Sequence, residues 1–175
     1  MRKSARLAAL GWVCLLAGPA SAKDKPVPFH SDMSAIETLS FFDPRCPETP
    51  VTAYHTATGV ATHLGAFTAV LSDCIDITRL ATEGVLRFDD GQSVMTAADG
   101  DELHATYHGD GFISAYDPDT GCTTYSLVVF QTFTGGTGRF AGASGSATGS
   151  AVVMGCDTTT WVNPWQNWMS GDITY

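Results

Sequence analysis

Histidines are the side chains of this sequence best suited to acid–base chemistry or metal binding, and five are present. His104 and His108 lie four residues apart in a segment that we predict to be a strand, so they share one face about 13 Å apart. Two ligands of one metal ion must each lie about 2 Å from it, so this pair alone cannot chelate. His55 and His63 would need a hairpin or bulge between them to meet. We therefore expect solvated or hydrogen-bonded histidines and no metal site.

Carboxylates gather in two short stretches that could offer oxygen ligands to calcium. The first holds Asp99, Asp101 and Glu102, and the second holds Asp117 and Asp119. Neither stretch fits a twelve-residue loop with spaced acidic ligands and a terminal Glu. Aspartates are common in turns because their side chains hydrogen-bond to nearby backbone amides, and we assign both stretches to turns.

A glycine-rich segment matches a nucleotide-binding fingerprint by its letters alone. Gly136, Gly138 and Ala141 have the spacing of the dinucleotide motif, and a predicted strand precedes them. That motif needs a helix whose first amides hold the pyrophosphate, but further glycines at 142, 145 and 149 disfavour a helix here. The serine-nucleophile elbow Gly-x-Ser-x-Gly is absent from the sequence. We predict no cofactor, and catalytic and ligand-binding residues stay unassigned.

Three tryptophans, Trp161, Trp165 and Trp168, form a dense aromatic cluster near the C-terminus. Large aromatic side chains usually pack in cores, so we favour a cluster that plugs one end of the fold or braces its lumen. The alternative is an exposed platform for a sugar or an apolar ligand.

Strand-forming patterns cover most of the chain, and no segment has ten or more residues of helical period. The predicted strands are Val51–Thr62, Gly65–Asp76, Gly84–Asp89, Gln92–Ala98, Glu102–Gly109, Thr123–Thr134, Ala143–Met154 and one within Thr158–Tyr175. An Asp-Gly pair at 99–100 indicates a hairpin. We predict an all-β domain, a closed eight-stranded antiparallel barrel, because closure removes exposed edges. Leu103, Ala105 and Tyr107 should face its interior.

The segment 135–149 predicts a hairpin turn between two of these strands. If the turn centres near Arg139, residues whose numbers sum to 278 lie opposite each other, and Cys122 and Cys156 form such a pair. Cross-strand neighbours lie close enough for a disulfide. Cys46 and Cys74 then form the second bond by elimination, and Phe140 should anchor the turn in the core.

The N-terminal residues 1–22 have the features of a signal peptide, with a basic start, the apolar run Leu7–Leu16 and an Ala-Ser-Ala cleavage site. We expect export to the periplasm or the medium, in a bacterial style, with four cysteines left to form two disulfides. Residues 23–50, which include Pro26, Pro28, Pro44 and Pro47, are predicted to form a leader packed on the barrel domain, 51–175. A short helical turn is possible at Met33–Leu39.

Acidic residues dominate the predicted mature chain. Removing the signal leaves six Lys and Arg against eighteen Asp and Glu, a net charge of −12. Such a surface argues against nucleic-acid binding and against anionic membranes. The sequence leaves the oligomeric state open.

The turn motif resembles a known family. Gly135, Gly136, Thr137, Gly138 and Phe140, with Ala143 and Gly145 following, are similar to the turn of the allene oxide cyclase barrel superfamily, which includes the dirigent proteins. Residues 59–65 and 99–103 resemble segments of small secreted bacterial proteins with this domain. The resemblance implies an eight-stranded calycin-like barrel, often with an apolar lumen.

These observations lead to one functional expectation with two alternatives. We expect an exported, disulfide-stapled barrel that binds a small apolar molecule in its lumen or serves another non-catalytic role outside the cytoplasm. The alternatives are a cyclase or isomerase that acts on a substrate inside the barrel, and a structural or interaction module. A lumen of roughly 300 Å³ or more would remove the purely structural alternative, and carboxylates or histidines inside it would favour the enzyme.

Overall fold

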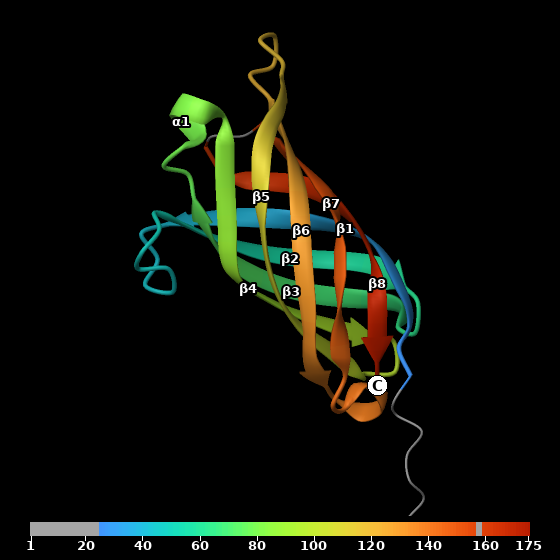
Figure 1. The fold of residues 1–175 in the computed structure, drawn as a ribbon. Coiled ribbons are helices and arrows are strands. Elements are labelled where there is room, and N and C mark those ends of the chain that lie inside the picture. Colours follow the sequence, from blue (N-terminus) through green and yellow to red (C-terminus); the bar gives the residue numbers. More distant parts are fainter. Residues whose placement is uncertain (1–24, 157–158) are drawn as a thin grey trace, which may run out of the picture.

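The chain forms a closed eight-stranded antiparallel barrel, as predicted (Figure 1). The computed structural model describes residues 25–156 and 159–175. Each strand pairs with the next, and the last strand pairs with the first. The elements in chain order are β1 (Val27–Phe41), β2 (Val51–Ala61), β3 (Gly65–Asp76), α1 (Leu80–Glu83), β4 (Val85–Ala97), β5 (Glu102–Tyr116), β6 (Thr123–Gly136), the 3-10 turn η1 (Gly138–Phe140), β7 (Ser144–Gly155) and β8 (Val162–Thr174).

The first strand corrects our expectation of a leader at 23–50. Residues Val27–Phe41 pair with β8 on one side and β2 on the other, so they close the barrel. Prolines do not prevent this, because Pro28 lies near the start of the strand and Pro44 and Pro47 lie beyond its end. The helical turn considered at Met33–Leu39 is strand as well. The predicted signal peptide, 1–22, lies outside the described residues.

Strand β4 joins two segments that we predicted as separate strands. Val85–Ala97 is continuous, and an irregularity between Phe88 and Gly91 takes up the Asp-Asp-Gly sequence that suggested a turn. Asp90 adopts a left-handed backbone conformation there, with φ 52°, which a bulge tolerates. The predicted number of eight strands is still correct. The structure adds β1, which was not predicted as a strand, and joins two predicted strands into β4.

The hairpin between β6 and β7 has the predicted register. Thr123 lies opposite Gly155 and Phe133 opposite Gly145, and both pairs sum to 278. Two disulfides join the cysteines that the sequence analysis paired, Cys122 with Cys156 and Cys46 with Cys74. These bonds indicate an oxidising compartment.

The turn of this hairpin closes one end of the barrel. Phe140 is fully buried, as expected of an anchor, and its ring packs 5.1 Å from that of Tyr175. Glycine is required at 138, where φ is 55° and a Cβ would collide with the Asp101 carboxylate. The rings of Phe29 and Phe133 pack edge to face at 4.7 Å nearby. Together with Leu103 and Ile173, both fully buried, they form a solid core at this end.

The other end carries the short helix α1 and the β5–β6 hairpin (Figure 1), and because Leu80 and Gly121 of these segments line the cavity described below, we refer to this end as the mouth. The 42–50 loop lies against the outside of β3, to which the Cys46–Cys74 disulfide attaches it. Within the described part of the chain, no helix has the length and apolar character needed to cross a membrane.

Candidate functional site: a polar belt inside the barrel

The barrel encloses a cavity of about 410 Å³ between the open mouth and the core of the closed end. Most of its wall is apolar and comes from all eight strands. The apolar lining includes Met33, Leu39, Leu71, Ile75, Leu86, Phe88, Leu127, Val129, Ala151 and Val153. A more open hollow lies on the outer face of β1, β2 and β3, but its lining contains no titratable side chain. The lumen is therefore the candidate site.

A chain of hydrogen bonds crosses one side of the lumen. Asp73 Oδ2 accepts a hydrogen bond from the Tyr107 hydroxyl at 2.7 Å and lies 2.8 Å from His55 Nε2. The indole N–H of Trp165 donates to His55 Nδ1 at 3.1 Å. An indole nitrogen only donates, so Nδ1 carries no proton and Nε2 carries the proton that binds Asp73. The chain therefore defines the tautomer of His55.

A second carboxyl faces the same histidine. Glu37 Oε1 accepts a hydrogen bond from the Asn163 amide at 2.8 Å, and Glu37 Oε2 lies 4.0 Å from His55 Nδ1. Burial raises the pKa of Glu37 above its ordinary value, against the opposing effects of His55 and Asn163. Burial likewise raises the pKa of the Tyr107 phenol, and the Asp73 charge raises it further.

We refer to Glu37, His55, Asp73, Tyr107, Asn163 and Trp165 as the polar belt. Strand register brings its members together: Glu37 lies directly opposite His55 on β2 and Asn163 on β8. Tyr107 fits because β4 has a glycine beside it, since a Cβ at Gly91 would lie 2.6 Å from the Tyr107 ring. The belt is thus assembled from five strands and is largely hidden from solvent.

Below the belt, toward the closed end, lies a further polar side chain. Asn167 follows Trp165 by two residues on β8 and faces the lumen, opposite Met33 on β1 and Ala151 on β7. Its amide nitrogen donates to the thioether of Met169 at 3.4 Å. Its Oδ1 atom is buried, with no hydrogen-bond partner among the described residues.

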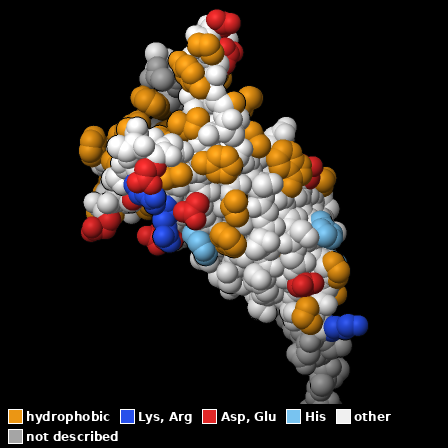
Figure 2. All heavy atoms as spheres, turned by 45° about the horizontal axis from the view of Figure 1, so that its top comes forward, with side chains coloured by type: hydrophobic (Ala, Val, Ile, Leu, Met, Phe, Trp, Pro, Cys, Tyr) orange, Lys and Arg blue, Asp and Glu red, His pale blue; other side chains and the backbone are white. Residues whose placement is uncertain are grey.

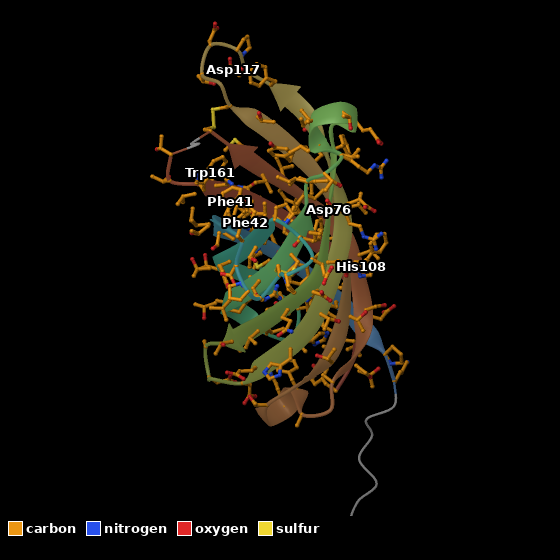
Figure 3. All side chains as sticks on the ribbon, turned by 90° about the vertical axis from the view of Figure 1, so that its left-hand side faces the viewer. Phe41, Phe42, Asp76, His108, Asp117 and Trp161 are labelled. Carbon is orange, nitrogen blue, oxygen red and sulfur yellow. A yellow bond between two sulfur atoms is a disulfide. The ribbon has the colours of Figure 1, made fainter. Side chains whose placement is uncertain are left out.

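Aromatic side chains line the mouth above the belt. Phe41 and Trp161 both line the cavity and pack edge to face with ring centroids 4.9 Å apart. Figure 3 shows them beside the exposed Phe42, with Asp117 at the tip of the β5–β6 hairpin. Figure 2 shows hydrophobic side chains spread over this end of the molecule. The approach to the lumen is therefore apolar.

Most of the histidines considered as candidate ligands in the sequence lie outside the lumen. His104 binds Glu102 at 2.9 Å on the outer surface, and His108 stacks on Phe130. His63 contacts the carbonyl of Pro28 at 3.0 Å, far from His55 in the fold.

The acidic stretches serve turns. Asp99 and Asp101 both bind the guanidinium of Arg139, and Asp117 accepts hydrogen bonds from its own turn. Among the described residues, no group of three or more His, Cys, Asp or Glu is placed to hold a metal ion.

The tryptophan cluster divides among three environments. Trp165 is buried in the lumen, Trp161 lies at the mouth, and Trp168 is exposed on the outside. Neither a single plug nor a single platform describes them.

The alternation of residues predicted Tyr107 inside the barrel, but no role was predicted for Glu37, Asp73 or Asn167. The available signal was a polar residue at an inward position of an otherwise apolar face, as at Glu37 between Ala35 and Leu39.

The arrangement combines a buried carboxyl whose pKa is raised by burial with an imidazole whose Nδ1 carries no proton, inside an apolar chamber. Such a pair can give a proton to a bound molecule and take one from it.

Comparison of the chain with protein-family models, curated proteins and solved structures found no significant match. The interpretation of the site therefore rests on its own geometry.

Proposed function

We propose that the protein is exported and binds a small, predominantly apolar molecule in the lumen, with a polar group of that molecule held at the belt. The observation that carries this proposal is the enclosed cavity of about 410 Å³, with apolar walls and a polar belt of fixed geometry. This volume lies within the range of small-molecule sites. A purely structural module would need neither the cavity nor the buried polar groups, which are costly to desolvate.

Native mass spectrometry of the purified protein tests for a bound molecule, and a fluorescence titration locates it. The neutral probe N-phenyl-1-naphthylamine should bind and brighten as it leaves water. Val129→Phe places a ring in the lumen and should weaken binding by at least about tenfold. Val128→Phe is the matched control, because the neighbouring Val128 is exposed outside the barrel.

Two outcomes would reject the proposal. One is the absence of both a co-purified molecule and probe binding. The other is equal weakening by the two valine variants, with both still folded by circular dichroism.

A second candidate function is isomerisation or cyclisation of the bound molecule, the activity class implied by the resemblance to allene oxide cyclases. It is favoured by Glu37, whose pKa is raised by burial, and by His55 Nδ1, which carries no proton and lies 4.0 Å from Glu37 Oε2. Glu37 would donate its proton to an oxygen of the substrate while His55 Nδ1, once the substrate displaces the Trp165 indole from it, removes a proton from a carbon. The hydroxyl proton then returns to Glu37 and His55 delivers its proton to a different carbon, which gives an isomer and restores both side chains. Asp73 would stabilise the imidazolium formed in between.

Deuterium exchange tests this candidate without knowledge of the substrate. Wild-type protein should accelerate exchange at the enolisable carbon of 2-tetralone in D2O, followed by NMR. Glu37→Gln and His55→Gln should each slow the catalysed exchange by about a hundredfold. Equal rates in the wild type and both variants would count against catalysis and leave the binding proposal intact.

A further inference from the structure

Asn167 is a buried amide that the protein itself does not satisfy. The side chain is 4 % exposed, and its Oδ1 atom has no partner among the described residues. The amide nitrogen reaches only the Met169 thioether, which is a weak acceptor. If the oxygen and nitrogen atoms of the amide were exchanged, even this hydrogen bond to Met169 would be lost. A buried carbonyl oxygen without a donor is destabilising, so a purely structural role does not account for Asn at this position.

The side chain of Asn167 faces the lumen. It lines the cavity, one inward position beyond Trp165 on β8, which is about 7 Å along the strand. Its direct neighbours across the strands are Met33 and Ala151, both apolar. A hydrogen bond made here is shielded from water and correspondingly strong.

We propose that Asn167 determines the specificity of the lumen, by accepting a hydrogen bond from a neutral hydroxyl or N–H group of the bound molecule. The proposal rests on the proposed binding function and adds the chemical class of the ligand. The ligand group must be a donor, because the free atom of Asn167 is an acceptor. It must be neutral, because the lining residues next to Asn167 offer no carboxylate to balance a cation. A ligand with such a donor therefore enters with that donor leading, past the belt to Asn167.

A matched pair of probes tests the requirement for a donor. 4-Butylphenol carries a hydroxyl, and 4-butylanisole has a methyl group in place of the hydroxyl hydrogen. Isothermal titration should show that the wild type prefers the phenol by about tenfold, the effect of one hydrogen bond in a dry site. Asn167→Leu and Asn167→Ala should both abolish this preference, and the alanine variant keeps room for either probe.

Thr52→Val is the control for a merely structural effect. Thr52 Oγ1 is the other buried side-chain atom without a partner among the described residues, but Thr52 does not line the lumen. Asn167→Leu and Thr52→Val should each raise the unfolding midpoint by about 2–4 °C, because each removes an unsatisfied polar group. Thr52→Val should leave the preference for the phenol unchanged.

The outcomes separate the two proposals. If the wild type binds both probes equally, or if the preference survives in both Asn167 variants, the assignment of Asn167 is overturned and binding in the lumen stands. If the wild type binds neither these probes nor N-phenyl-1-naphthylamine, the binding function itself is overturned, and the assignment of Asn167 with it.

Discussion

The indole N–H of Trp165 donates to Nδ1 of His55 at 3.1 Å, and the two rings meet at 88°. This contact leaves Nε2 as the protonated nitrogen, aimed at Asp73. It joins β8 to β2 across the lumen, although β1 lies between these strands in the sheet. The tautomer of His55 is therefore set by a residue 110 positions away in the sequence.

Trp165→Phe should release this constraint. Among the described residues, Trp165 alone donates to Nδ1, so in this variant the free energy of unfolding should fall by about 1–3 kcal/mol. In the wild type, 15N NMR of His55 should report a proton on Nε2 alone. In the variant, both tautomers should be populated. A single unchanged tautomer in Trp165→Phe would show that Asp73 alone determines the proton position.

Glu37→Gln should change how stability depends on pH. Burial raises the pKa of Glu37 above 4.5, so the folded protein holds this proton more tightly than the unfolded chain does. The resulting stabilisation is full below about pH 4.5 and is lost as the pH rises through the folded pKa. Glutamine does not titrate, so the variant should gain stability relative to the wild type as the pH rises.

Urea unfolding at about pH 4 and about pH 8 measures this difference. Glu48→Gln, at an exposed carboxyl in the 42–50 loop, serves as the control for the loss of one carboxyl. A pH dependence for Glu37→Gln no larger than that for Glu48→Gln would contradict a raised pKa.

Gly91→Ala should disturb the polar belt by displacing Tyr107. The added Cβ would collide with the Tyr107 carbonyl and lie 2.6 Å from its ring, so Tyr107 must move away from Asp73. We expect a loss of about 1–3 kcal/mol in thermal or urea unfolding, as for other overpacked sites. Gly155→Ala is the control, because the nearest atom to its Cβ would be 3.4 Å away. Equal stabilities of the two variants would contradict the tight fit at Gly91.

Replacing Cys46 and Cys74 together by serine should release the 42–50 loop from β3, next to Asp73. The bond closes a segment with a sequence separation of 28, and its loss should cost about 2–4 kcal/mol in unfolding. The guanidinium of Arg45, which donates to both sulfurs at 3.3 Å and 3.0 Å, would lose these two contacts and keep those to the carbonyls of Ser72 and Asp90. Peptide mapping of the non-reduced protein provides the independent check, and a link from Cys122 to Cys46 or Cys74 would contradict this pairing.

Local signals predicted much of the barrel. Alternating apolar residues placed Leu103 and Ala105 inside, and the glycine-rich turn set the β6–β7 register through which Cys122 meets Cys156. Local signals misled where they were ambiguous. Prolines around β1 suggested a leader, and Asp89-Asp90-Gly91 suggested a turn where the structure has a bulge. In both cases pairing with neighbouring strands outweighed local preference, because a strand gains two sets of hydrogen bonds when the barrel closes.

The all-β domain, the hairpin register and the faces of individual strands could be predicted from the sequence, since these depend on residues close together in the chain. The meeting of Glu37, His55, Asp73 and Tyr107 in one belt, with Asn167 below it, depends on the three-dimensional pairing of the strands. Alternation along a strand tells which side chains point inward but not how far along the barrel each one lies. That level depends on the pairing of β1 with β8 and on the bulges in β3 and β4, which shift one strand relative to the next.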